Sequence, residues 1–429
     1  MNIIQDEEDR QPANDLAELL AIHHQFGHIS MRKLQEMAKQ GILPRRLSKC
    51  RVPTCSACLY ARATKRPWRS KPKKNGDDGL KPTKPGQVVS VDQLVSPTPG
   101  LIAQMTGFLT TKRYRYATVY VDQFSRLGFI YLQKTASAEE TVEGKKAFEA
   151  YSHRHGVKIE NYHADNGIFK AYKWTDTCKQ DGQGMTLAAV NAHHQNGIAE
   201  RRIRELQDLT RAMLAHVNAQ WSDSITANLW PEAIRNAGNA INHTPSMHGA
   251  DRRCPIEMFS NSKVATNPKH WKPFGCPTYV HVLTSELQSN RPFHKWSQRS
   301  KAGIYLGRSP QHGRNVALVM DRDTALVSPQ FHVAYDDNFD NVRNIKTKST
   351  WLGGIRHNSE GASEKGCDDT AETIGEHDSV RQEAKAWPQP HIRRVWKGRQ
   401  SGTFKTEGAS CSKRRGRRST DTHQHDDNG

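Results

Sequence analysis

The order of apolar segments between residues 86 and 242 restricts the fold more than any other feature of this sequence. Three segments typical of strands come first, GQVVSVDQLV, YRYATVYVDQF and GFIYLQ. A helix with a Ser137–Glu140 capping box follows, and then a fourth strand, VKIENYHAD. Helices over about 197–217 and 227–242 complete the pattern. Strands that are followed and interrupted by helices predict a mixed α/β layer fold.

The segments on either side of this pattern differ in composition, which predicts five parts of the chain. Residues 1–65 are expected to be helical, because Leu and Met recur there at helical spacing. A basic linker rich in Pro and Gly covers 66–86, and the α/β core covers 87–250. Short apolar runs between turn residues predict a small antiparallel β-domain over 251–341. The segment 342–429 is poor in apolar residues, so we expect it to be disordered.

Charge and cysteine content narrow the class of protein. The chain has 63 Lys and Arg against 44 Asp and Glu, a net charge of +19, which favours a polyanionic partner such as nucleic acid. No apolar stretch is long enough to span a membrane, and the acidic N-terminus lacks an apolar signal core. Three of the eight cysteines fall within nine residues, a spacing that favours metal ligands over a disulfide framework.

Three acidic residues far apart in the chain are candidates for one catalytic site. Asp92 ends one predicted strand and Asp165 ends another, where a carboxylate avoids the cost of mid-strand burial. Glu200 lies in the first turn of the helix over 197–217. If these elements are neighbours, the three carboxylates converge and need cations among them to remain ionised. Two Mg²⁺ ions would suit them and would support phosphoryl transfer. The alternative is that Glu200 only stabilises its helix through the helix dipole.

The helix that carries Glu200 has two distinct faces. Glu200, Arg204, Gln207 and Arg211 fall within a narrow arc, and a separate apolar face would pack on the sheet. Arginines beside a metal site suit contact with a DNA backbone, so we expect Arg204, Gln207 and Arg211 to bind DNA. An ordinary solvated face with i,i+4 pairs is the alternative. Asn196 is expected to be the N-cap.

A structural zinc site is predicted near the N-terminus. His23 and His28 form a His-x4-His pair, and after 26 further residues Cys55 and Cys58 form a Cys-x2-Cys pair. Two imidazoles and two thiolates are a common closed Zn²⁺ set, and a small helical segment gains stability from such an ion. His24 remains an alternative to His23, because His24-x3-His28 is also a workable pair.

Several motifs resemble the integrase region of copia-type LTR retrotransposon polyproteins. HADNGIF and HHQNGIAERRIRELQDLTRAML resemble the end of the integrase core, and ATVYVDQFSRLGFIYL resembles its preceding strand pair. HHQFGH with CSAC resembles the pre-integrase zinc segment, and HWKPFGCPTYVHV onward resembles the SH3-like β-domain. The resemblance implies a ribonuclease H-like fold, two catalytic Mg²⁺ or Mn²⁺ ions, one structural Zn²⁺ and an Asp92, Asp165, Glu200 triad. Such a protein trims element DNA ends and joins them to target DNA.

Other expectations follow from the same resemblance. Asp122, in the turn VDQFSR, is acidic in the family without belonging to the triad, so we interpret it as structural. Ile168 and Phe169 stand where the family usually has Gly and Glu. A decayed or co-opted DNA-binding copy, and a transposase or nuclease on the same scaffold, are therefore the rival interpretations. We expect DNA as the partner, a homo-oligomer as a further candidate, and the nucleus as the site of action, after a cytoplasmic particle stage.

Overall fold

The computed structural model describes residues 15–63, 82–103, 110–188, 196–222, 225–247, 251–281 and 298–342, apart from 311, 314 and 323. These residues belong to one compact unit, Met1–Glu364. Most of the expected linker at 66–86 and nearly all of the expected tail at 342–429 lie outside the described residues. No helix in the described ranges has the length and apolar character needed to cross a bilayer.

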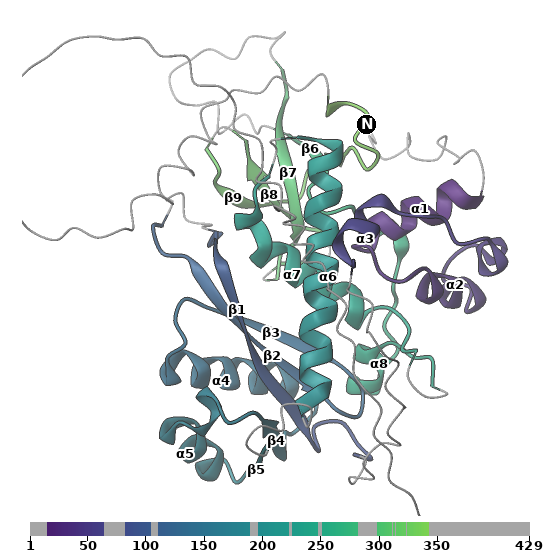
Figure 1. The fold of residues 1–429 in the computed structure, drawn as a ribbon. Coiled ribbons are helices and arrows are strands. Elements are labelled where there is room, and N and C mark those ends of the chain that lie inside the picture. Colours follow the sequence, from purple (N-terminus) through teal and green to yellow (C-terminus); the bar gives the residue numbers. More distant parts are fainter. Residues whose placement is uncertain are drawn as a thin grey trace, which may run out of the picture. The chain divides into compact units, whose positions relative to one another are not determined.

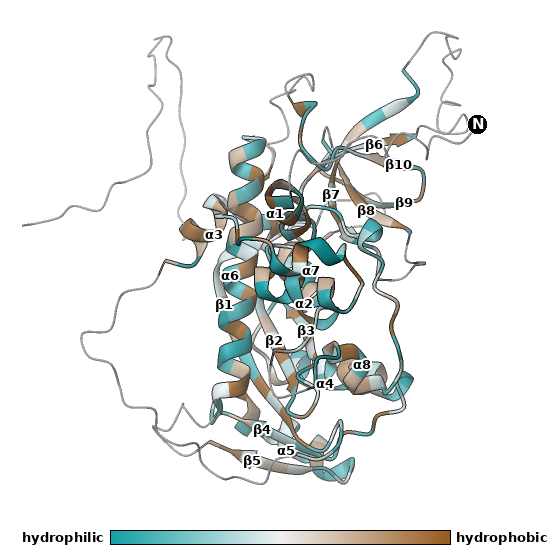
Figure 2. Cartoon of the chain, turned by 90° about the vertical axis from the view of Figure 1, so that its right-hand side faces the viewer, coloured by the Kyte–Doolittle hydropathy of each residue, from teal (hydrophilic) through white to brown (hydrophobic). Residues whose placement is uncertain are grey.

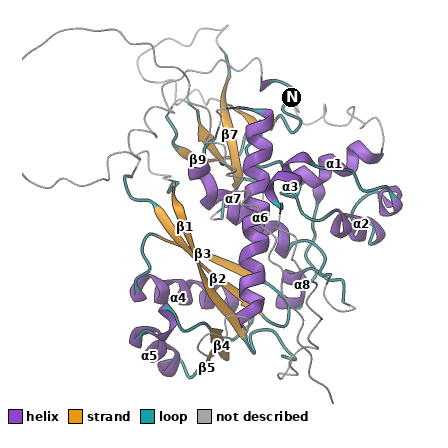
Figure 3. Ribbon diagram, viewed as in Figure 1, coloured by secondary structure: helices purple, strands orange, loops and turns teal. Residues whose placement is uncertain are grey.

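The first sheet has five strands in the order β3-β2-β1-β4-β5 (Figure 3). They are β1 (Val89–Gly100), β2 (Tyr114–Asp122), β3 (Gly128–Gln133), β4 (Asn161–Ala164) and β5 (Gly184–Leu187). β1 pairs antiparallel with β2 and parallel with β4, so the sheet is mixed. With helices packed on both faces, this arrangement confirms the predicted ribonuclease H-like α/β fold.

One face of the sheet is covered by α4 (Ala138–Arg154) and α5 (Tyr172–Gln180). Val89 and Val91 of β1 and Tyr162 of β4 pack there against Phe148 of α4 and Trp174 of α5. All five side chains are buried. Val89 and Val91 are two residues apart, so both point to this face while Asp92 points to the other.

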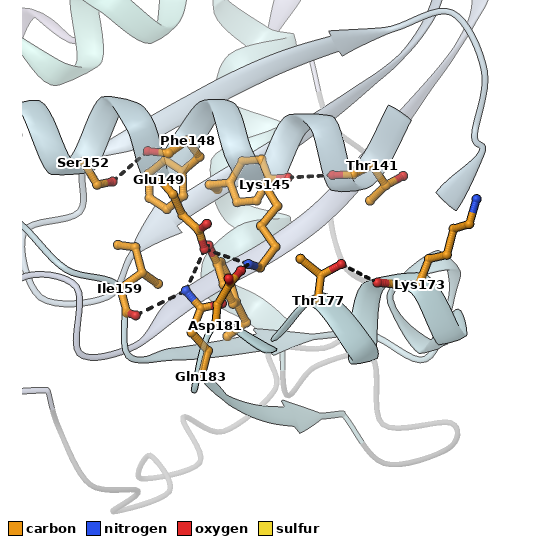
Figure 4. Close-up of polar contacts among 12 residues, drawn as sticks. Thr141, Lys145, Phe148, Glu149, Ser152, Ile159, Lys173, Thr177, Asp181 and Gln183 are labelled. Atoms are coloured by element: carbon orange, nitrogen blue, oxygen red, sulfur yellow. Dashed lines mark hydrogen bonds and ion pairs between the residues drawn. The ribbon is translucent and has the colours of Figure 1, made fainter. Parts of the chain in front are cut away.

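A buried lysine joins the two helices of this layer. The side chain of Lys145 in α4 is fully buried, and its Nζ lies 2.9 Å from Glu149 Oε1 and 2.5 Å from Asp181 Oδ2 (Figure 4). Glu149 Oε1 also accepts hydrogen bonds from Tyr162 Oη and from Gln183 Nε2. These bonds compensate the desolvation of the ammonium group, which would otherwise be costly.

The opposite face of the sheet is covered by α6 (Gly197–Gln220) and α7 (Trp230–Asn242), with a short 3-10 helix, η5 (Ala227–Leu229), before α7. Figure 1 shows the lower part of α6 crossing β1 and β2, and Figure 2 shows that the residues of α6 itself are partly hydrophobic and partly hydrophilic. Its buried residues are Ala199, Arg202, Leu206, Leu209, Thr210, Ala212, Met213, His216 and Val217. The apolar part of this stripe fixes the helix to the sheet, as its periodicity predicts.

The N-terminal segment forms α1 (Asp15–Gln25), α2 (Met31–Lys39), the 3-10 helix η2 (Arg45–Lys49) and α3 (Ser56–Ala61). The helical conformation is interrupted between α1 and α2, where Gly27 and His28 both have φ of 62°. Glycine adopts this conformation freely, whereas histidine does so at a cost. The left-handed turn therefore interrupts the helical segment that the Leu and Met spacing predicts.

The second sheet is antiparallel and has the order β10-β6-β7-β8-β9. Its strands are β6 (Pro277–His281), β7 (Ser300–Arg308), β8 (Ala317–Asp321), β9 (Val327–Gln330) and β10 (Val333–Tyr335), and α8 (Pro255–Ser260) and the 3-10 helix η6 (Pro268–His270) precede them. Trp271, between η6 and β6, stacks on Phe26 with ring centroids 4.7 Å apart and lies 4.6 Å from the Arg308 guanidinium carbon. One apolar core therefore includes residues from the N-terminal segment, the α/β core and the second sheet.

Candidate functional site

Two of the three candidate catalytic acids come from neighbouring strands. Asp165 directly follows β4, as expected, but the expectation that Asp92 ends its strand is wrong, because β1 continues to Gly100 and Asp92 pairs with Val119 of β2. The parallel pairing of β1 with β4 ends at Val91 and Ala164, which are Cα partners in the register. Asp92 and Asp165 are the next residue on each strand, and both are half-buried. Asp92 Oδ1 accepts a hydrogen bond from the backbone N–H of Gln93 at 2.8 Å. The structure therefore brings the two aspartates to adjacent positions at one end of a parallel strand pair.

The third acid, Glu200, lies in the first turn of α6 and is half-buried. The start of α6 is fastened to the same strand end: Asn196 Nδ2 donates a 2.9 Å hydrogen bond to the carbonyl of Val91. Asn196 is the N-cap residue of α6, as expected, but its side chain makes no cap hydrogen bond to the helix. The amide is directed to the sheet instead.

The three carboxylates do not meet as closely as a coordinated set would. Within the described residues, one group of at least three His, Cys, Asp or Glu side chains has all its ligand atoms within 4.8 Å of one another. None of the three acids belongs to that group. Like charges hold such side chains apart unless a cation lies between them. Asp92, Asp165 and Glu200 nevertheless supply the carboxylate oxygens that Mg²⁺ and Mn²⁺ prefer, so their chemistry fits these ions.

A nearby acid, Asp122 at the end of β2, has a structural role. Its side chain is fully buried, and its oxygens accept hydrogen bonds from Gly86 N at 2.8 Å, Ser125 N at 2.7 Å and Ser125 Oγ at 2.6 Å. Burial raises the pKa of Asp122, and the three hydrogen bonds oppose that rise. The carboxylate is occupied in closing the β2–β3 turn, as the sequence predicts.

The predicted DNA-binding residues of α6 have different surroundings. Arg204 is exposed and Gln207 is half-buried. Arg211 is exposed too, but its Nε donates to the carbonyl of Ala61 at 3.2 Å, and its guanidinium also contacts Asp208. Arg211 therefore attaches the end of α3 to α6, whereas Arg204 is directed to solvent. DNA contact by these three residues stays a prediction.

The departure at Ile168 and Phe169 is accommodated by the core. These residues begin a short 3-10 helix, η3 (Ile168–Lys170), which starts three positions after Asp165. Phe169 is buried, and its ring meets that of Trp174 edge-on with centroids 5.1 Å apart. An aromatic residue at this position thus anchors the loop after Asp165 to the α5 layer.

The predicted zinc ligands form one compact cluster. The donor atoms of His23, His28, Cys55 and Cys58 all lie within 4.8 Å of one another. His23 Nε2 is 3.2 Å from Cys58 Sγ, and His28 Nδ1 is 3.5 Å from Cys55 Sγ and 3.6 Å from Cys58 Sγ. Tetrahedral bonds of about 2.0–2.3 Å place ligand atoms roughly 3.3–3.8 Å apart, so the cluster fits Zn²⁺.

The surroundings favour His23 over His24 as the fourth ligand. His23 Nδ1 donates to the carbonyl of Ile29 at 2.8 Å, which directs Nε2 toward the cluster. The cluster includes His23 and not His24, whose Nε2 lies 3.7 Å from Cys55 Sγ. The ring of His24 instead packs on that of His216 in α6, with centroids 4.0 Å apart.

The pKa shifts of His28 and Cys55 suit metal binding. Burial lowers the pKa of His28 to about 4, so its imidazole is neutral at neutral pH. Hydrogen bonds from Cys58 and the neighbouring histidines lower the pKa of the Cys55 thiol. A neutral imidazole and a thiolate are the forms that bind zinc.

Sequence reasoning missed two buried polar residues on α6. Arg202 donates from Nη2 to the carbonyl of Arg126 at 2.9 Å and lies 3.4 Å from Glu205. His216 is buried between His24, His28 and Phe339. The sequence indicates their burial only through their positions, because both fall on the apolar stripe of the helix.

Comparison with known proteins gives relatives of one kind. No family model matches the chain. The chain is 24% identical over 291 residues, 66% of its length, to the retrovirus-related Pol polyprotein from transposon RE1 of Arabidopsis thaliana. It is 24% identical over 264 residues, 61% of its length, to the corresponding polyprotein from transposon TNT 1-94 of Nicotiana tabacum. The matches span 17% and 18% of these relatives.

Solved structures that resemble the chain include retroviral integrase catalytic cores. The HTLV-2 core solved with magnesium is 15% identical, with 41% of this chain and 98% of that one covered and a TM-score of 0.30. The BIV core is 18% identical, with 41% and 95% covered and a TM-score of 0.29. Homologues of this chain are thus retrovirus-related Pol polyproteins of plant transposons, and the predicted resemblance to the integrase region of copia-type elements is confirmed.

Proposed function

We propose that the chain is a retroelement integrase, a polynucleotidyl transferase that processes element DNA ends and joins them to target DNA. The observation that carries this proposal is the position of Asp92 and Asp165 directly after the last register pair between β1 and β4, to which the start of the helix with Glu200 is hydrogen-bonded. The relatives, which are transposon Pol polyproteins, support an integrase-like function.

In this proposal each acid has a defined task. Asp92, Asp165 and Glu200 would hold two Mg²⁺ or Mn²⁺ ions. When bound, such ions activate an attacking hydroxyl and stabilise the leaving oxygen of a phosphodiester. The exposed guanidinium of Arg204 is one turn beyond Glu200, where it can bind a DNA phosphate and orient the backbone.

The zinc centre has a structural task in the same proposal. His23, His28, Cys55 and Cys58 would hold one Zn²⁺ in a closed site with no open coordination position. The ion would order the N-terminal helices, which pack on α6 through Arg211 and Ala61. The partners we propose are DNA and a second copy of the chain, and the proposed site of action is the nucleus.

A strand-transfer assay with blunt element DNA ends, a plasmid target and Mn²⁺ tests the function. We expect wild-type chain to join the ends and Glu200→Gln to abolish joining while it retains the fold and DNA binding. Glu205→Gln is the matched control, because it removes from the same helix one carboxylate that pairs with Arg202 and does not belong to the proposed triad. Joining by Glu200→Gln would contradict the triad assignment.

The same assay separates the rival functions. A wild-type chain that binds DNA but neither cuts nor joins it is a decayed or co-opted binding protein. A wild-type chain that cuts DNA without joining it is a nuclease. Either result would overturn the integrase proposal.

A further inference from the structure

The buried side chain of Asn196 links the two elements that carry Asp92 and Glu200. Asn196 is 1% exposed and lies four residues before Glu200, at the start of α6. Its Nδ2 donates to the carbonyl of Val91, the residue before Asp92. A helix end and a strand position that are far apart in sequence are thus joined by one hydrogen bond.

The place of this bond in the sheet is specific. Val91 and Ala164 are the last register pair between β1 and β4, and beyond them Asp92 and Asp165 follow. After Asp165 the β4 chain turns away into η3, while β1 continues along β2. The amide of Asn196 supplies a hydrogen-bond donor to β1 at the position where its parallel neighbour ends.

Helix capping does not explain this asparagine. Its φ of −92° and ψ of 24° lie outside the β region that N-cap residues usually adopt, and it makes no cap hydrogen bond. Optimal stability does not explain it either, since its buried Oδ1 has no hydrogen-bond partner among the described residues. An unpaired buried acceptor costs free energy.

A second asparagine in the same helical layer shows the contrast. Asn242, at the end of α7, donates from Nδ2 to the carbonyl of Gly128 at 2.7 Å and accepts at Oδ1 from Gly128 N–H at 3.0 Å. It joins a helix to β3 with both polar atoms satisfied, and it lies on an element that carries none of the three acids. Asn242 therefore serves as a matched control for Asn196.

We infer that Asn196 is a positioning residue that fixes Glu200 relative to Asp92, and thereby sets the affinity of the three acids for a divalent cation. This inference rests on the proposed function, because it assumes that the three acids bind the ion. Residues that orient metal ligands without touching the metal affect metal affinity about 10–100-fold.

The test measures Mn²⁺ binding to the full, zinc-loaded chain by electron paramagnetic resonance of the free ion. We expect Asn196→Ala to raise the Kd for Mn²⁺ about tenfold or more. Asn242→Ala is expected to lower the melting temperature with an unchanged Kd. Asn196→Ser, which keeps a small polar side chain too short to reach Val91, is expected to behave like Asn196→Ala and serves where the alanine variant folds poorly.

Joining assays add a kinetic readout. The Mn²⁺ concentration for half-maximal joining should rise in Asn196→Ala, whereas the KM for DNA should stay unchanged. An unchanged Mn²⁺ Kd in a folded Asn196 variant overturns the inference. Failure of the proposed function has a different signature. In that case the Asp92→Asn variant would bind as much Mn²⁺ as the wild-type chain does.

Discussion

The ring of His24 lies against the ring of His216, with 4.0 Å between their centroids. His24 adjoins the proposed zinc ligand His23, and His216 lies on the buried face of α6, so the contact joins the N-terminal segment to the helix that begins near Glu200. The Arg211–Ala61 hydrogen bond is a second link between the same two elements. The packing of α6 therefore depends on whether the N-terminal segment is folded.

Removal of zinc should loosen α6 as well as the N-terminal segment. A chelator would take away the proposed ion between residues 23 and 58, so we expect those helices to open and expose His216. We expect a lower melting temperature and faster hydrogen exchange in 15–63 and in the second half of α6, with α4 unchanged. If hydrogen exchange became faster only in residues 15–63, the packing of α6 would not depend on the N-terminal segment.

Two cysteine variants provide the control for this experiment. Cys58→Ser should eliminate the one bound zinc per chain in elemental analysis, because Cys58 belongs to the cluster. Cys50→Ser should retain zinc, since Cys50 Sγ is directed to the carbonyl of Arg51 and lies outside the cluster. Equal zinc content in both variants would refute the ligand set.

The parts of this fold that obey hydrophobic periodicity could be predicted from the sequence. Strand β3 begins and ends where the GFIYLQ run does, and α6 begins directly after Asn196. The position of Asp165 after a strand could be anticipated because an acid at a strand end avoids burial, whereas Asp92 lies within β1, at the point where the pairing with β4 stops. The cluster of His and Cys residues could be anticipated because a Cys-x2-Cys pair together with two histidines is typical of a structural zinc site.

The parts that depend on long-range contacts could not be predicted. Asn196 is a good N-cap by residue type, but the carbonyl of Val91, 105 positions earlier in the chain, competes successfully for its amide. The Ser137–Glu140 capping box forms only on one side, since Ser137 Oγ accepts from Glu140 N while the Glu140 carboxylate accepts from Lys134 N. Strand β5 was missed because GMTL is too short to show a period.

Replacement of Asp122 should cost stability without affecting metal binding. Asp122→Asn turns one oxygen of the buried carboxylate into an NH₂ group that faces either the N–H of Gly86 or the donors of Ser125. We expect a loss of about 2 kcal/mol in the free energy of unfolding. Urea denaturation measures it, and an unchanged Mn²⁺ Kd separates Asp122 from Asp92.

The two arginines on the outer face of α6 should differ in their effect on DNA binding. Arg204→Ala should weaken binding to all DNA sequences alike and reduce the slope of log K against log salt by about 1, as the loss of one phosphate contact does. Arg211→Ala should instead speed hydrogen exchange in α3, because Arg211 is bonded to Ala61. Fluorescence anisotropy at several salt concentrations measures the slopes, and equal slopes for Arg204→Ala and wild type would exclude the phosphate contact.

The buried ion pair between α4 and α5 should matter far more than an exposed one beside it. Lys145→Ala leaves Glu149 and Asp181 without their cation, and because both carboxylates are partly exposed we expect a loss of about 2–3 kcal/mol. Lys173→Ala, which breaks the exposed pair with Glu139, should cost about 0–1 kcal/mol. Chemical denaturation of both variants gives the comparison, and similar losses would show that burial of Lys145 adds nothing.

Truncation of Trp271 should weaken the packing of three segments together. Its indole stacks on Phe26 of the N-terminal segment and under Arg308 of β7, so Trp271→Ala removes apolar contacts in both directions. We expect a loss of about 3–5 kcal/mol for alanine, and a smaller loss for Trp271→Phe, which keeps a stacking ring. Limited proteolysis should then cut the alanine variant near residue 271 before it cuts the α/β core. Simultaneous cleavage of the core would mean that the three segments unfold as one cooperative unit, with Trp271 inside it.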